Sequence, residues 1–181
     1  AGHALSLFAI ELAKARAVAE AERRLQGDFF DALAAGTLTP QELARGLQRF
    51  GFTRDGAVLV AALEGGAPEQ IAYAAEDHLS RREGPYLISR NEHEVHVLLP
   101  AEPPPDLGTL RTAVAGRIGG EIRLGSGGAV APAEVGRSLR EARYALQVCR
   151  LEGWEAAGFE DLGTYRLLLS MADPDALRAF S

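Results

Sequence analysis

Several features that mark secreted, membrane-spanning or DNA-binding proteins are missing from this sequence. It has one cysteine, Cys149, so no disulfide can form within the chain, and a reducing compartment is expected. No apolar run approaches the roughly 18 residues of a membrane span, and the N-terminal residues lack the pattern of a secretory signal peptide. Acidic residues outnumber basic ones by 25 to 19, giving a net charge of −6, whereas DNA-binding surfaces are usually basic. We therefore expect a cytoplasmic protein that binds neither membranes nor, by itself, DNA.

The common catalytic motifs are missing as well. The four histidines are scattered, and no Ser-His-Asp or Cys-His arrangement can be assembled around them. Cys149 lies within the apolar pattern of an expected helix, which favours a buried packing role over a reactive thiol. The rest of the composition, with 47% hydrophobic and 24% charged residues among 181, is that of a globular protein. This length accommodates one domain with additional helices.

The longest periodic segment covers residues 4–35, which we predict to form one continuous helix ending at Gly36. Its apolar residues recur at spacings of three, four and seven, and its opposite face is charged. One hypothesis is that this stripe pairs with the same helix of a second copy to form a homodimer, and the alternative is packing on the domain that follows. The residues assigned to the dimer seam are Leu5, Phe8, Leu12, Val18, Leu25, Phe29 and Leu33.

A second helix is predicted to begin at Thr39. A threonine cap, a proline in the first turn and Glu42 at the capping-box position are a strong helix start, and Gly51 marks the end. Residues 39–52 also resemble the first half of a helix-turn-helix. The apolar run of residues 57–63 that follows is typical of a buried strand, so no recognition helix is available and DNA reading by this segment is disfavoured.

From residue 56 onward the pattern alternates between strands and helices. The order β-α-β-β-α-β predicts an α+β fold with a ferredoxin-like sheet and helices on one face. A short edge strand within residues 158–163 and helical turns at 164–171 and 174–180, with Asp173 as an N-cap, are expected to follow. The predicted elements are a strand at 57–64, a helix at 68–82, a hairpin at 85–90 and 94–99, a helix at 107–118, a strand at 121–125 and a helix at 133–151.

The segment 138–150 (SLREARYALQVCR), after a strand that ends in glycine, resembles the closing helix of nucleotide-cyclase GGDEF domains, which reads A-D-x-A-L-Y-x-A-K. The residues that fit this frame are Ala142, Ala145, Leu146 and Arg150. Arg143, Gln147 and Cys149 stand where the frame has Asp, Tyr and Ala. The resemblance therefore implies that the scaffold is kept without its chemistry.

The same resemblance implies where metal and nucleotide would bind. A cyclase of this type needs carboxylates after the first strand and a Gly-Gly-[Asp/Glu]-Glu-Phe hairpin, and oxygen ligands are hard to replace. The positions nearest the metal aspartates are Ala61, Ala62 and Leu63, and only Glu64 offers a carboxylate there. Residues 91–95 replace the hairpin motif, with both glycines gone. We expect no catalytic, metal-binding or cofactor-binding residues and no enzymatic activity.

Two smaller patterns have alternative interpretations. Glu92, Glu94 and His96 would share one face of an extended strand, which suits a metal site, but a solvated hairpin tip is the favoured reading. The glycine-rich residues 124–128 (LGSGG) could hold a phosphate, but they lack the P-loop and GxGxxG spacings. A turn leaving a strand accounts better for these glycines.

Taken whole, the order of features resembles the PucR/CdaR family of bacterial transcription regulators, most specifically at residues 12–38 and 138–180. The resemblance implies a dimerisation and linker region at 1–51, a degenerate GGDEF-like domain at 52–163, and a segment at 164–181 leading to a helix-turn-helix beyond the sequence. It implies DNA binding only through that further domain, and a non-catalytic role in signal relay. The alternatives are a small-molecule or nucleotide-sensing module and, least favoured, an active cyclase. The effector is not identified by the sequence.

Overall fold

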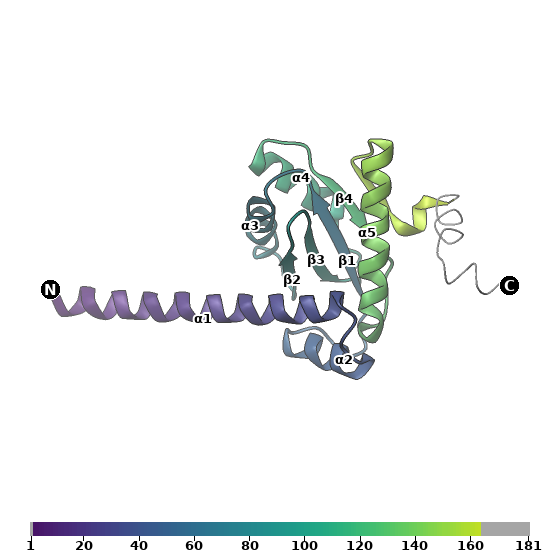
Figure 1. The fold of residues 1–181 in the computed structure, drawn as a ribbon. Helices are drawn as coiled ribbons and strands as arrows, with labels where there is room; N and C mark the ends of the chain where they lie inside the picture. Colours follow the sequence, from purple (N-terminus) through teal and green to yellow (C-terminus); the bar gives the residue numbers. More distant parts are fainter. Residues whose placement is uncertain (1, 164–181) are drawn as a thin grey trace.

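The computed structural model describes residues 2–163 (Figure 1). The helical turns expected at 164–171 and 174–180, including the Asp173 cap, lie outside the described residues. Within residues 2–163, no helix combines the length and apolar character needed to cross a membrane. The helices are α1 (Gly2–Ala34), α2 (Pro40–Arg49), α3 (Pro68–Leu79), α4 (Leu107–Ile118) and α5 (Val135–Glu152), with short 3-10 turns at η1 (Pro132–Glu134) and η2 (Phe159–Leu162).

The centre of the fold is a five-stranded sheet with the order β2-β3-β1-β4-β5. The first four strands each run antiparallel to their neighbours, and β5 runs parallel to β4. This order, with α3 following β1 and α4 following β3, is the predicted ferredoxin-like βαββαβ unit, so the α+β prediction is confirmed. The strands are β1 (Val58–Glu64), β2 (Leu87–Arg90), β3 (Val95–Pro100), β4 (Arg123–Ser126) and β5 (Ala156–Gly158).

Strand β1 lies in the middle of the sheet, and every one of its residues is buried. Side chains alternate along it between the two faces of the sheet. Ala61 and Leu63 pack with Ile71 of α3 and Leu110 of α4. The prediction of a buried strand from this apolar run is therefore confirmed, and both faces of the strand are covered.

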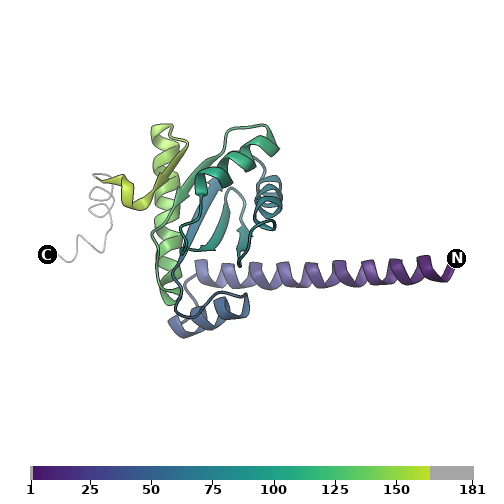
Figure 2. The ribbon, with the colours of Figure 1, turned by 180° about the vertical axis from the view of Figure 1, so that it is seen from behind.

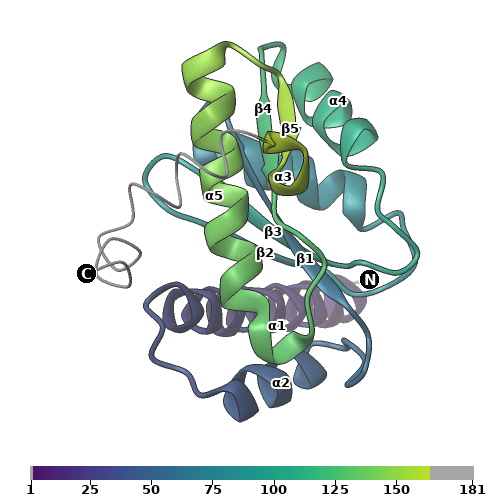
Figure 3. The same ribbon diagram turned by 90° about the vertical axis from the view of Figure 1, so that its right-hand side faces the viewer.

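The two helices of the βαββαβ unit share one face of the sheet, as expected, whereas a further helix covers the other face, which was not predicted. α3 and α4 lie on one face, while α5 crosses the other (Figure 3). Val60 and Ala62 of β1 pack there with Ala142 and Leu146 of α5. The apolar positions of α5 recur at helical spacing, so this long helix needs a sheet face of its own to bury them.

Helix α2 begins as the sequence predicts. The Thr39 hydroxyl accepts a hydrogen bond from the Glu42 backbone N–H at 3.3 Å, and the Glu42 carboxylate accepts one from the Thr39 N–H at 2.8 Å. The Glu42 carboxylate also accepts a hydrogen bond from the Thr39 hydroxyl at 2.9 Å, and the two bonds to this carboxylate hold the pKa of Glu42 below its usual value. The helix ends at Arg49, and Gly51 has a φ of 93°, a left-handed conformation suited to glycine. Leu43 and Leu47 of α2 pack in the same core as Phe30 and Leu33 of α1.

Helix α1 is a single helix of 33 residues whose N-terminal half projects away from the rest of the fold (Figures 1 and 2). All described residues before Ala19 are exposed, whereas Phe30 and Leu33 near the other end are buried. The backbone N–H of Gly36 donates to the Leu33 carbonyl, which closes the helix at the predicted place. We call the end of α1 that contains Phe30 and Leu33 its base, and the exposed residues before Ala19 its arm.

The element bounds differ most from prediction at two places, and elsewhere by one or two residues. α3 ends at Leu79, three residues before the predicted end, and Gly84 then turns the chain with a φ of 107°. The edge strand lies at Ala156–Gly158, and the segment expected to form it is mostly the 3-10 turn Phe159–Leu162. Because β5 has only three paired residues, its alternation is too short to be recognised from sequence.

Candidate functional site

Two carboxylates lie side by side at the end of β1 that leads into α3. The antiparallel register pairs Leu63 with Val95, which places Glu64 at the end of β1 beside Glu94, the residue before β3. On the other side of β1, Glu64 pairs with Arg123 of β4. These are the positions at which the cyclase resemblance implies metal-binding chemistry.

The guanidinium of Arg150 from α5 lies between these two carboxylates. Its Nε lies 3.1 Å from Oε1 and 3.2 Å from Oε2 of Glu64, and a terminal nitrogen also donates to Glu64 Oε2. The same terminal nitrogen lies 3.8 Å from Oε1 of Glu94. Hydrogen bonding to Glu64 raises the pKa of Arg150. Arg150 is therefore a permanent positive charge bonded to one carboxylate and close to the second.

Glu94 has two further partners. The His96 ring nitrogen Nε2 lies 3.0 Å from Glu94 Oε2, and Nε of Arg143 lies 3.5 Å from the same oxygen. The hydrogen bond from His96, together with the charges of His96, Arg143 and Arg150, lowers the pKa of Glu94 against the effect of burial. The carboxylate is thus held in its charged form and surrounded by cationic or hydrogen-bonding groups of its own chain.

His96 connects this site to helix α1. Its side chain is buried, and its ring stacks on Phe30 with centroids 6.2 Å apart and planes 23° from parallel. Phe30 belongs to the buried base of α1. A continuous set of contacts therefore runs from α1 through Phe30, His96 and Glu94 to Arg150.

The arrangement disfavours a divalent cation at this place. Magnesium needs several oxygen ligands in near-octahedral geometry, whereas Arg150 already supplies positive charge to Glu64. Within residues 2–163, no group of three or more His, Cys, Asp or Glu side chains is placed to hold a metal ion. We call Glu64, Arg150, Glu94, Arg143 and His96 the arginine-bridged cluster.

The possible trio of Glu92, Glu94 and His96 is brought together only in part. Glu94 and His96 meet, but Glu92 is almost fully exposed and lies 3.9 Å from His93 instead. The favoured reading as a solvated hairpin tip fits Glu92 and is wrong for the buried His96. The reason is that β3 begins at Val95, so the sheet and α5 enclose the residues next to it.

The glycines of residues 124–128 serve helix packing. A Cβ on Gly125 would lie 2.2 Å from the Leu146 backbone nitrogen, and one on Gly127 would lie 2.1 Å from the Ser138 carbonyl oxygen. The Gly128 N–H donates to the Glu141 carboxylate at 2.8 Å. The segment is thus pressed against α5, and a donor that a phosphate would need already binds a carboxylate of the chain.

The predicted seam residues divide into two groups. Leu33 is buried, and the half-buried Phe29 packs against the same core, with its ring 5.5 Å from that of Phe50. These two positions therefore pack within their own chain, because α1 meets α2 at its base. The other five predicted seam residues are exposed along α1: Leu5, Phe8, Leu12, Val18 and Leu25.

Sequence reasoning did not identify the partners of Arg150 and Arg143. The two arginines lie seven residues apart on α5, which places them on the same face of the helix. This spacing, with carboxylates at the ends of two predicted neighbouring strands, was the available signal. Its interpretation required the packing of α5 on the sheet, which brings Arg150 to Glu64, 86 positions away in sequence.

The fold defines a class, the ferredoxin-like α+β domains, and here Arg150 is bonded to the carboxylate of Glu64 at the end of the central strand. The sequence model of the GGDEF-like domain matches residues 35–148, more than half of the chain. The chain therefore belongs to the GGDEF-like domain family. A comparison with curated proteins gives no match.

Proposed function

We propose that this chain is a non-catalytic dimerisation and signal-relay domain of a cytoplasmic bacterial transcription regulator of the PucR/CdaR type. The observation that carries the proposal is the continuous contact from α1 through Phe30 and His96 to the arginine-bridged cluster. It joins the projecting arm to the place where a cyclase would perform its chemistry. A site built in this way transmits a change in packing rather than turning over a substrate.

The non-catalytic role is supported by charge. Glu64 is bonded to Arg150, and Glu94 is close to both Arg150 and Arg143. A nucleotide triphosphate with its metal ion would have to displace these arginines from their carboxylates. Breaking such partly buried pairs costs several hydrogen bonds to charged groups, each worth about 2 kcal/mol.

Dimerisation is supported by the arm of α1. Leu5 is 73% exposed and Phe8 is 68% exposed, and neither has an apolar neighbour in its own core. An isolated helix in water is only marginally stable, so a long projecting one requires a partner for its apolar side. The seam spacing of the five exposed residues fits a second copy of the same helix.

The relay follows from the rigid connection at the base of α1. Phe30 and Leu33 hold this end of the helix in the core, and Arg23 adds an ion pair to Glu76 of α3 at 3.8 Å. A rotation or register change in a helix seam therefore moves Phe30 relative to His96. In the proposed regulator, DNA is bound by a separate helix-turn-helix domain, which agrees with the acidic charge of this chain.

The sensing alternative gains no support at the places first considered for it. Residues 124–128 are packed against α5, and both faces of the sheet are covered by helices.

Sedimentation equilibrium of matched double variants tests the dimer. Phe8→Glu with Leu12→Glu places two charges on the seam, and Ala13→Glu with Ala17→Glu places the same charges at the same spacing on another side of α1. We expect the first pair to give monomers and the second to retain the dimer mass. A wild-type monomer at all concentrations, or equal masses for both variants, would contradict the proposal.

A further inference from the structure

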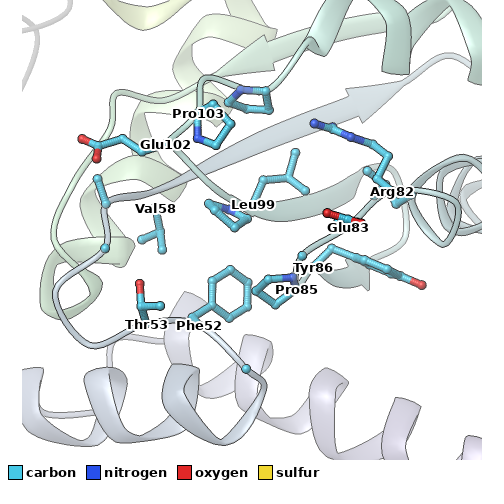
Figure 4. A pocket seen from close by; sticks show the side chains of 17 residues that line it. Phe52, Thr53, Val58, Arg82, Glu83, Pro85, Tyr86, Leu99, Glu102 and Pro103 are labelled. Atoms are coloured by element: carbon cyan, nitrogen blue, oxygen red, sulfur yellow. The ribbon is translucent and has the colours of Figure 1, made fainter.

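A cavity of about 330 Å³ lies at the opposite end of the sheet from the arginine-bridged cluster (Figure 4). It is enclosed by the start of β1, the end of β3, the turn after α2 and the turn between α3 and β2. The cluster, in contrast, lies where β1 ends and β3 begins. The cavity is therefore separate from the cluster described above.

The floor of the cavity is apolar and rigid. Phe52, Val58, Leu79 and Leu99 line it and are each almost fully buried. Prolines form much of the remaining wall, and their restricted backbone keeps a pocket preformed. The lining prolines are Pro85, Pro100, Pro103 and Pro105.

Two opposite charges stand over this floor. Figure 4 shows the Arg82 guanidinium and the Glu83 carboxylate reaching toward the space above Leu99, whereas the Glu102 carboxylate points away from it. Within residues 2–163, neither Arg82 nor Glu83 forms an ion pair. The neighbouring Arg81, in contrast, is paired with Asp77 at 3.0 Å.

Asp106, an acid near Arg82, already has hydrogen-bond partners of its own. Its carboxylate accepts hydrogen bonds from the backbone N–H and the hydroxyl of Thr109 at 2.9 and 2.6 Å, and these bonds, with a smaller contribution from the charge of Arg82, lower the pKa of Asp106. These bonds cap helix α4 and orient Asp106 toward it. The hydrogen-bonding capacity of Arg82 thus remains available to a ligand.

We propose that this cavity binds a compact zwitterion with an apolar body, the simplest example being an α-amino acid with an apolar side chain. Its carboxylate would bind Arg82, its ammonium group would bind Glu83, and its side chain would lie on Phe52 and Leu99. A pocket with an apolar floor and a few polar groups at its mouth is the usual form of a small-molecule site. A zwitterion satisfies both charges, whereas a simple acid or amine would leave one of them facing the wrong sign.

Occupancy of this cavity would reach helix α1. Phe52 lies directly after α2 and packs in the same core as Leu47, Phe30 and Leu33. A ligand resting on Phe52 therefore bears on the residues that anchor the base of α1. This gives the domain a ligand input that is distinct from the seam and from the arginine-bridged cluster.

Amide NMR titration of the full chain tests the proposal, with L-leucine and L-phenylalanine as probes. The amides of Gly51, Gly56 and Gly84 should shift with saturation, whereas that of Gly119, at the far end of α4, should not. The matched compounds 4-methylpentanoate and 3-methylbutylamine each lack one charge of L-leucine and should bind at least about tenfold more weakly.

Three single variants separate this site from a general effect. Arg82→Gln and Glu83→Gln should each weaken amino-acid binding about tenfold or more, while Arg81→Gln, which removes a charge outside the lining, should leave it unchanged. Absence of shifts with both amino acids would overturn the proposal. Equal affinity for L-leucine and 4-methylpentanoate, or equal effects of Arg81→Gln and Arg82→Gln, would do the same.

Discussion

Phe30 of helix α1 stacks on His96 of strand β3, with ring centroids 6.2 Å apart. Phe30 is fully buried at the base of a helix whose other half is exposed, and His96 shares a hydrogen bond with Glu94. This contact connects helix α1 to the arginine-bridged cluster. The relay that we propose for this domain depends on this contact.

Removing the arginine should destabilise the fold. Arg150→Ala leaves Glu64, whose side chain is 12% exposed, without its main partner. We expect a loss of about 2 kcal/mol in the free energy of unfolding, less than for a fully buried pair because Arg150 is half exposed. Urea unfolding measures this loss. The double variant Arg150→Met with Glu64→Leu should recover most of it, and a double variant as unstable as Arg150→Ala would count against an electrostatic origin.

Acid should weaken the fold partly through Glu94. Its folded pKa is lowered from the ordinary value of 4.5, so its contribution is complete above that value and is lost as pH falls through the lower folded pKa. Glu94→Gln should therefore be less stable than the wild type near neutral pH and should show a shallower stability decline below about pH 5. Unfolding curves from about pH 7 to pH 3 test this. Glu92→Gln, at an exposed position, is the control and should follow the wild-type profile.

The close approach of β4 to α5 should make Gly125 intolerant of substitution. Gly125→Ala would place a Cβ 2.2 Å from one backbone atom and 2.4 Å from another, so the strand and helix must separate. We expect a loss of about 2 kcal/mol or more, measured by thermal unfolding. Gly116→Ala, at an exposed position of α4 with no atom within 4 Å of the new Cβ, should instead stabilise the fold by about 0.5–1 kcal/mol. Similar effects at the two positions would refute the packing explanation.

No cyclic dinucleotide should form from GTP. Glu64, the carboxylate nearest the metal position that the resemblance implies, is bonded to Arg150. The amount of cyclic dinucleotide should therefore stay at the protein-free background with either magnesium or manganese. Chromatography of the nucleotide products measures this directly. Product formation that is lost in Glu64→Gln would overturn the non-catalytic role.

The parts of the fold that sequence predicted are those with local causes. The buried β1 follows from one apolar run, and the start of α2 follows from the side chains of Thr39 and Glu42. The layer that covers the second sheet face was not predicted, because it depends on how α5 returns across the sheet. The partners of Arg150 depend on the same return path, since Glu64 lies 86 positions away in sequence.

The seam shows a related limit. Phe29 and Leu33 share the spacing of the exposed residues on the arm, so periodicity alone places them in one stripe. The structure separates them because α2 folds back against the base of α1. A periodic pattern therefore shows which side chains share a face, but it does not show whether its own chain or a partner covers that face.

The most direct test of the relay compares the His96 ring resonances in wild type and in the two double variants of α1. If seam pairing is transmitted through Phe30, Phe8→Glu with Leu12→Glu should shift the His96 ring signals, although both substitutions lie in the N-terminal part of α1, far in sequence from Phe30. Ala13→Glu with Ala17→Glu should leave these signals at their wild-type positions. Identical His96 signals in all three proteins, with the seam variant shown to be monomeric, would contradict the account.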